Sequence, residues 1–224
     1  MAHKRTWRMV TILGCLIALG VSSPAQADGR RFEVTITNLT AHQVFTPIMV
    51  ASHRKGVQLF TLGQPASVEL EILAEAGDTG PLSAALAARS DVLEVTTGGP
   101  LPAGQSQTIF VGTRDGFDHV SVAAMLVPTN DGFFAVNGVE GPEGNEELTL
   151  LSVAYDAGTE ANDELCAHIP GPPSVCTGEG FNPSRTGAEG FVHIHRGIHG
   201  GGDLSAGVWD WRNPVAKVTV RRVR

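Results

Sequence analysis

Acidic side chains are concentrated in one short segment of the chain, residues 156–164. The segment reads Asp-Ala-Gly-Thr-Glu-Ala-Asn-Asp-Glu. Calcium takes about six to eight oxygen ligands, and such a loop offers carboxylates, a hydroxyl group and backbone carbonyls together. An EF-hand is excluded, because Ala161 occupies the sixth position of the loop, where that motif requires Gly. The residues alone therefore allow a calcium site of another kind or an acidic loop that is exposed to solvent.

Three histidines follow in the pattern His193-x-His195-x-x-x-His199. On a strand, His193 and His195 point to the same face, and His199 could fold back toward them. Imidazole nitrogens in this arrangement suit Zn²⁺ or Cu²⁺, and Glu189 or Asp203 could orient the rings. The pattern indicates either a transition-metal binding protein, including a metalloenzyme, or histidines that only form hydrogen bonds with neighbouring loops.

The chain lacks the motifs of nucleophilic catalysis and phosphate binding. It has no Gly-x-Ser-x-Gly segment, and the glycines at 200–202 are not followed by the Lys and Ser or Thr of a phosphate-binding loop. Apart from the metalloenzyme that the histidines would allow, we therefore expect no catalytic activity.

Two tryptophans, Trp209 and Trp211, stand two residues apart. On a strand, this spacing would place both indole rings on one face. Such a pair either packs into the core or lies on the surface, where it could bind a glycan.

Short runs of β-branched and apolar residues recur along the chain and predict about seven to nine strands, which is typical of an antiparallel sandwich. The first run is the clearest, because Phe32, Val34 and Ile36 alternate with polar residues. The other predicted strands span residues 44–50, 92–95, 108–111, 120–127, 133–136, 148–154, 191–195 and 215–223.

Between residues 65 and 89 the apolar positions follow helical spacing, which predicts two short helices separated by Gly77–Pro81. Thr79 is a candidate N-cap for the second helix, and Pro81 fits its first turn. We expect the helices to cover one end of the sandwich.

Residues 162–190 are rich in Gly, Pro and polar side chains and predict a long loop.

Residues 1–27 have the composition of a cleaved secretory signal. Basic residues come first, Met9–Val21 is apolar, and Ala25-Gln26-Ala27 supplies small residues at the cleavage site. The apolar stretch of about 13 residues is shorter than the roughly 20 that a transmembrane helix needs. We therefore expect a secreted or periplasmic protein with one domain at residues 28–224 and no membrane span.

The chain of 224 residues has 16 basic and 23 acidic side chains, a net charge of −7. Removal of residues 1–27 takes away three basic side chains and no acidic ones, which leaves 13 basic against 23 acidic side chains and a net charge of −10. An acidic surface argues against binding to nucleic acid or an anionic membrane and suits cations. The hydrophobic content of 42% excludes a disordered chain.

Two cysteines remain after the predicted signal, Cys166 and Cys176, in a compartment where disulfides persist. We expect a disulfide bond between them. A pair of metal thiolates is the alternative, but the two residues lack the CxxC spacing of such sites.

Several segments resemble the spondin amino-terminal domain, the module found in F-spondin, mindin and bacterial secreted proteins. These segments are Phe32–Thr40, Phe45–Pro47, Leu73–Thr79, Met125–Val136 with its Pro-Thr-Asn-Asp-Gly-Phe sequence, and Tyr155–Glu160. The segments Glu189–Gly200 and Trp211–Pro214 look like the bacterial branch. The resemblance covers nearly the whole chain after residue 27.

The resemblance implies an antiparallel β-sandwich of a variant C-two type that binds Ca²⁺ through loop carboxylates at one end. The family's ligands correspond to Asp131, Asp156 and Glu160, the last of which is Asp in animal members. Those members act as matrix and adhesion modules rather than enzymes. The resemblance therefore implies a non-catalytic module that binds an extracellular or envelope protein or a glycan. A structural envelope protein without bound metal is the remaining alternative.

Overall fold

The computed structural model describes residues 29–224. The predicted signal peptide at residues 1–27 lies outside these residues. Within residues 29–224, no helix combines the length and the apolar character that a membrane crossing requires.

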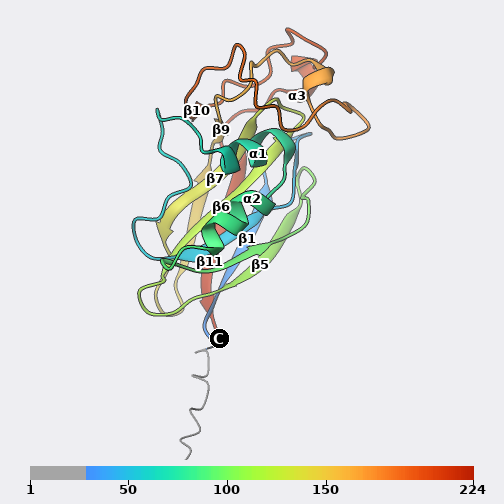
Figure 1. Cartoon of the computed structure of the whole chain (residues 1–224). Coiled ribbons are helices and arrows are strands. Elements are labelled where there is room, and N and C mark those ends of the chain that lie inside the picture. Colours follow the sequence, from blue (N-terminus) through green and yellow to red (C-terminus); the bar gives the residue numbers. More distant parts are fainter. Residues whose placement is uncertain (1–28) are drawn as a thin grey trace, which may run out of the picture.

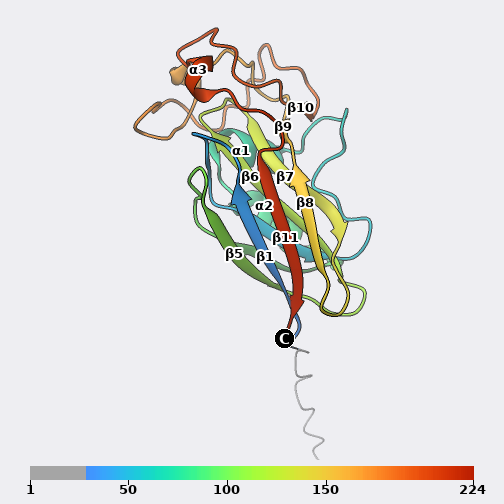
Figure 2. The same cartoon turned by 180° about the vertical axis from the view of Figure 1, so that it is seen from behind.

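Two antiparallel sheets form the body of the molecule (Figure 1). The smaller sheet has the strand order β5-β1-β11-β8, and Figure 2 shows these strands side by side. Its strands are β1 (Arg31–Asn38), β5 (Ser106–Gly112), β8 (Glu147–Ser152) and β11 (Ala216–Val223). The predicted all-β sandwich is confirmed.

The larger sheet has the order β10-β9-β7-β6-β3-β4, with β2 paired to β6. Its strands are β2 (Val44–Phe45), β3 (Met49–His53), β4 (Val92–Thr97), β6 (His119–Val127), β7 (Gly132–Glu140), β9 (Ala154–Asp156) and β10 (His193–Ile194). The described residues thus contain eleven strands, more than predicted. The predicted run 44–50 divides into β2 and β3, and the predicted run 148–154 divides between β8 and β9, which accounts for the two additional strands.

The main core lies between the two sheets. Phe32, Val34 and Ile36 point into it from β1, and each is 0% exposed. Val122 and Phe134 face them from the larger sheet. The alternation that predicted β1 therefore marks the face on which this strand is buried.

Two helices, α1 (Val68–Ala76) and α2 (Gly80–Ala87), occupy the segment where the sequence predicts them. Ser67 caps α1, because its hydroxyl accepts a hydrogen bond from the backbone N of Leu70 at 3.3 Å. Thr79 holds the N-cap position of α2, as expected, but its side chain makes no capping hydrogen bond.

Both helices lie on the outer face of the larger sheet (Figure 1), and the expectation that they cover an end of the sandwich is wrong. Leu70, Leu73 and Leu82 pack with Met49 and Phe133 in a second core. Strand β6 is consequently buried along its whole length and shows no alternation of buried and exposed residues. The larger sheet is thus a central layer between the helices and the smaller sheet.

Irregular segments after β9 gather at one end of the sandwich, drawn from orange to red in Figure 1. They contain a short 3₁₀ helix (Cys166–His168) and α3 (Ala206–Trp209), and residues 157–192 form no strand. The predicted long loop is thus confirmed.

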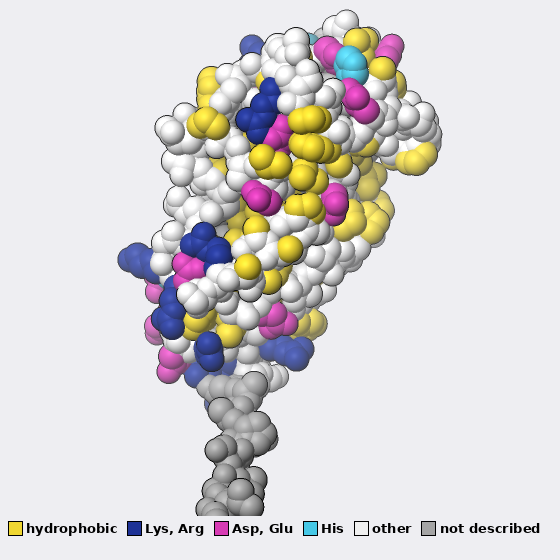
Figure 3. All heavy atoms as spheres, in the orientation of Figure 1, with side chains coloured by type: hydrophobic (Ala, Val, Ile, Leu, Met, Phe, Trp, Pro, Cys, Tyr) yellow, Lys and Arg dark blue, Asp and Glu magenta, His cyan; other side chains and the backbone are white. Residues whose placement is uncertain are grey.

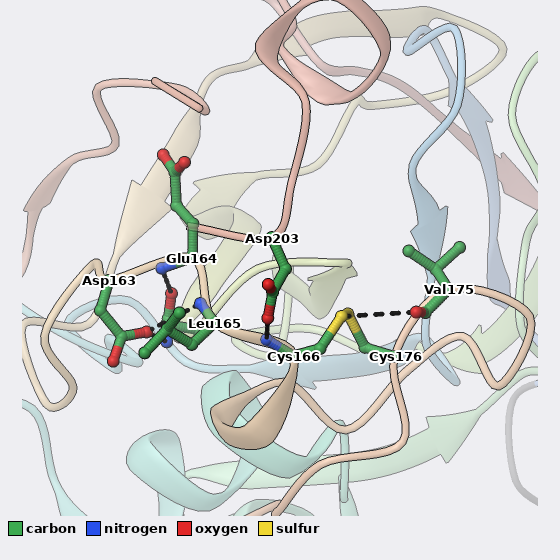
Figure 4. Close-up of a disulfide and its surroundings, with 8 residues drawn as sticks. Asp163, Glu164, Leu165, Cys166, Val175, Cys176 and Asp203 are labelled. Carbon is green, nitrogen blue, oxygen red and sulfur yellow. Dashed lines mark hydrogen bonds between the residues drawn. A yellow bond between two sulfur atoms is a disulfide. The ribbon is translucent and has the colours of Figure 1, made fainter. Parts of the chain in front are cut away.

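The predicted disulfide between Cys166 and Cys176 is present (Figure 4). The backbone N of Cys166 also donates a hydrogen bond to Asp203, at 2.9 Å, which ties this loop to the segment before α3. The predicted shared strand face of the two tryptophans is wrong. Trp209 ends α3, whereas Trp211 is buried against the ring of His195.

Candidate metal centre

Strands β7, β9 and β10 bring several predicted ligands to one end of the larger sheet. Asp131 directly precedes β7, Asp156 ends β9 and His193 begins β10. The strand pairing aligns Gly132 with Asp156 and Asp156 with His193. Side chains that are far apart in the sequence therefore become neighbours.

Asp156 reaches this end because the chain changes sheets. Strand β8 belongs to the smaller sheet and β9 to the larger one, with Val153 between them. The side-chain oxygen of Asn213 accepts a hydrogen bond from the backbone N of Ala154 at 2.8 Å, which holds the chain after the crossing. On the face shown in Figure 3, most Lys and Arg side chains lie at the opposite end, acidic side chains are spread over the whole face, and histidine is visible at the site end.

Asp131 is fully buried, with 0% of its surface exposed. Its Oδ2 accepts hydrogen bonds from the backbone N of Thr159 at 2.7 Å and of Glu160 at 3.1 Å. Its Oδ1 has no hydrogen-bond partner among the described residues. Burial, reinforced by the negative charge of Asp156, raises the pKa of Asp131 well above its ordinary value.

Asp156 is also buried, and both of its oxygens are oriented by the loop that follows. Oδ1 accepts a hydrogen bond from the backbone N of Gly158 and Oδ2 from the side chain of Asn162, at 2.8 and 2.7 Å. Burial raises the pKa of Asp156, while the hydrogen bond from Asn162 and the charge of His193 act in the opposite direction. A carboxylate oxygen with one hydrogen bond keeps capacity for a further partner.

Glu160 is buried beside other carboxyl groups. Its Oε2 has no hydrogen-bond partner among the described residues. Burial, followed by the negative charges of Glu75 and Asp131, raises the pKa of Glu160 to about 9. Glu160 also lines a cavity of about 260 Å³, together with His168 and Arg185.

Glu75 is a buried carboxyl group near Glu160 that was not among the residues predicted from the sequence. It lies on α1, is 0% exposed, and its Oε2 accepts a hydrogen bond from the backbone N of Asn182 at 2.8 Å. Burial raises the pKa of Glu75 as well. Its position among Leu73 and Ala74, on the apolar side of a predicted helix, was the available signal, because a charged residue there needs a partner.

A compact group of possible metal ligands lies on the other side of Asp156. Within residues 29–224, the ligand atoms of Asp156, Glu189 and His193 all lie within 4.8 Å of one another. His193 Nε2 is 3.4 Å from Asp156 Oδ1 and 3.9 Å from Glu189 Oε1. In this part of the chain, neither the three predicted carboxylates nor the three predicted histidines form such a group.

The histidines of the predicted pattern differ in tautomer. His193 Nδ1 lies 3.0 Å from the carbonyl oxygen of Ile194, so this nitrogen carries the hydrogen. His195 Nδ1 instead accepts a hydrogen bond from the backbone N of Gly197 at 3.0 Å, which leaves the hydrogen on Nε2 of the neutral ring. Burial, followed by the charge of His193, lowers the pKa of His195 to about 3. His199 is more exposed, and its Nδ1 is 3.5 Å from Glu164.

Gly158 allows the segment with Glu189 to lie against the loop after Asp156. Its φ is +66°, in the left-handed region that favours glycine. A Cβ at this position would lie 2.3 Å from the carbonyl oxygen of Phe191. The carbonyl of Gly158 accepts a hydrogen bond from the backbone N of Gly190 at 2.9 Å.

The family comparison covers the part of the chain that contains the predicted calcium ligands. The model of the spondin N-terminal domain, Spondin_N, matches residues 37–166, which is more than half of the 224 residues. Asp131, Asp156 and Glu160 lie inside this range, whereas Glu189 and His193 follow it. No curated protein matches the chain. Because the match spans most of the sandwich, the chain belongs to the spondin N-terminal domain family.

Proposed function

We propose that the protein is an exported, non-catalytic binding module that holds Ca²⁺ through Asp131, Asp156 and Glu160. Family membership supports the domain type. The expected partner is an extracellular or envelope protein or a glycan, and the expected location is outside the cytoplasm, either secreted or periplasmic.

The observation that carries the calcium proposal is the burial of the Asp131 carboxyl group with one oxygen left without a hydrogen bond among the described residues. This carboxyl group lies beside Asp156, whose negative charge reinforces the effect of burial on its pKa. An unpaired buried charge is costly, and neighbouring like charges increase that cost. The donor set suits a hard divalent cation, because a cation among these carboxylates would remove the repulsion and use the free oxygens. Binding would draw the three carboxylates closer together, since within residues 29–224 their ligand atoms do not all lie within 4.8 Å of one another.

The chain's own residues would orient the ligands. The backbone N–H groups of Thr159 and Glu160 hold Asp131, and the side chain of Asn162 holds Asp156. Bound Ca²⁺ would supply the positive charge that these buried carboxylates lack. The loop after β9 would then be tied to the start of β7, which would give a partner an ordered surface at this end of the sandwich.

A calcium titration of chelator-treated protein tests this proposal. We expect a saturable rise in melting temperature with Ca²⁺, as ligand linkage requires. Asp156→Ala should weaken calcium binding by at least about tenfold, roughly 1.4 kcal/mol, because an anionic ligand is lost. Asp115→Asn provides a control, since the Asp115 side chain is 90% exposed and should leave the titration unchanged.

Two results would contradict the proposal. An unchanged affinity in Asp156→Ala would show that Ca²⁺ binds elsewhere. A wild-type protein without any saturable calcium effect would instead favour a structural envelope protein that binds no metal.

A further inference from the structure

We propose that Asp156, Glu189 and His193 form a second cation site that binds a divalent transition-metal ion such as Zn²⁺. This site goes beyond the calcium site proposed above, with which it shares Asp156. It also differs from the site suggested by the histidine pattern, because only one of those three histidines takes part.

The hydrogen bonding of His193 prepares it to bind a metal. Its Nδ1–H donates to the carbonyl oxygen of Ile194, so the lone pair is on Nε2. That nitrogen has no hydrogen-bond partner among the described residues and faces Asp156 and Glu189. Metal-bound histidines commonly have this arrangement, in which the second ring nitrogen donates to a carbonyl or carboxylate oxygen.

The separations between ligand atoms approach those of a small cation site, because all three atoms lie within 4.8 Å of one another. Two atoms that each lie about 2.0 Å from a tetrahedral zinc ion are about 3.3 Å apart. His193 Nε2 and Asp156 Oδ1 are 3.4 Å apart, and the 3.9 Å between His193 Nε2 and Glu189 Oε1 would shorten on metal binding through rotation of the longer Glu189 side chain. The imidazole ligand favours a transition metal, because Ca²⁺ and Mg²⁺ select oxygen ligands.

The two carboxylates are already held in place. The side-chain nitrogen of Asn162 donates to Asp156 at 2.7 Å and to Glu189 at 3.3 Å, so one amide positions both. Arg196 lies 3.8 Å from Glu189 and partly balances its charge. Glu189 Oε2 has no hydrogen-bond partner among the described residues, which leaves it free for a metal.

An independent feature also points into this group. The side chain of His195 is only 2% exposed, and its Nε2 has no hydrogen-bond partner among the described residues. This nitrogen lies 4.0 Å from Asp156 Oδ2. Because its Nδ1 accepts from the backbone N of Gly197, the hydrogen of the neutral ring is on Nε2, the nitrogen nearer to Asp156. His195 is thus a buried ring beside the shared carboxylate and lies outside the group of proposed ligands.

The site is open on one side. The side chains of His193 and Glu189 are 19% and 25% exposed, whereas Asp156 is 1% exposed. An ion can thus enter from solvent, and three protein ligands leave a coordination position for water or for a group of a partner.

Zinc titration of chelator-treated protein, followed by calorimetry, tests the proposal. We expect one saturable zinc site. His193→Ala should weaken zinc binding by at least about tenfold, because loss of even a residue that only orients a metal ligand commonly costs about 10–100-fold in affinity. Glu189→Gln should also weaken it and provides a second variant if His193→Ala does not fold. His199→Ala is the matched control, because this imidazole lies outside the group and should have no effect.

The same variants separate the two metal proposals. Glu160→Gln should weaken calcium binding and preserve zinc binding, whereas His193→Ala should do the reverse. Zinc affinity that is unchanged in both His193→Ala and Glu189→Gln would overturn the second site. Zinc affinity that falls in Glu160→Gln as much as in His193→Ala would also overturn it, because the ion would then occupy the carboxylate site.

Discussion

Glu160 is the carboxyl group whose titration has the clearest consequence for the metal-free protein. Burial and the nearby charges of Glu75 and Asp131 raise its pKa from 4.5 to about 9. Below pH 4.5 the group is protonated in both the folded and the unfolded chain. Between about pH 4.5 and 9, only the folded chain keeps the proton, so the folded state binds more protons and its stability falls as the pH rises.

We therefore expect the free energy of unfolding, measured in a chelator by urea denaturation, to decrease between pH 5 and pH 8. The contribution of Glu160 has a slope of up to about 1.4 kcal/mol per pH unit. Glu160→Gln should reduce this slope, because the amide stays neutral. Equal slopes in both proteins would show that Glu160 ionises normally. Glu69→Gln, at a partly exposed position of α1, is the control.

At the scale of the elements, the site depends on close contact between the loop after β9 and the segment that leads into β10. Gly158 makes this contact possible, through its positive φ and through the space that a side chain would take from the backbone of Phe191. Gly190 also has a positive φ, of +86, but no atom lies within 4 Å of a Cβ built there.

Substitutions at these two glycines separate the effect of backbone strain from the effect of close contact with a neighbouring segment. Gly190→Ala should cost about 1–2 kcal/mol, the usual cost of a left-handed conformation for a residue with a Cβ. Gly158→Ala should cost more and should also weaken zinc binding, because the segment with Glu189 and His193 must move away from Asp156. Equal stability losses with unchanged zinc affinity in Gly158→Ala would contradict this account. Thermal unfolding and zinc titration measure the two effects.

At the scale of the whole molecule, the larger sheet is covered on both faces, and the second core joins the helices to it. Leu73 is fully buried in this core, whereas Val68 on the same helix is 54% exposed. We expect Leu73→Ala to reduce the free energy of unfolding by about 2–5 kcal/mol. Val68→Ala should change it by less than about 0.5 kcal/mol.

Because α1 also carries Glu75, Leu73→Ala should affect calcium binding as well as stability. Loosening this helix should shift Glu75 relative to Glu160 and weaken calcium binding, while Val68→Ala should not. Denaturant unfolding and calcium titration of both variants check this. A Leu73→Ala protein as stable as Val68→Ala would mean that the helices pack loosely on the sheet.

Much of the fold could be predicted because its signals are local. The alternation of Phe32, Val34 and Ile36 identified β1, and the helical spacing of residues 65–89 identified both helices. The even cysteine pair identified the disulfide. The position of the helices could not be predicted, because a buried strand such as β6 does not reveal whether its second face is covered by a sheet or by helices.

The all-β class, the family and a set of candidate ligands could be inferred from the amino-acid sequence, because these follow from residue type, short spacing and resemblance to known segments. Only the tertiary structure decided which of them meet. Strand register placed Asp156 between Gly132 and His193, and this brought in Glu189. Helix packing placed Glu75 near Glu160. Such contacts join residues distant along the chain, and no local pattern encodes them.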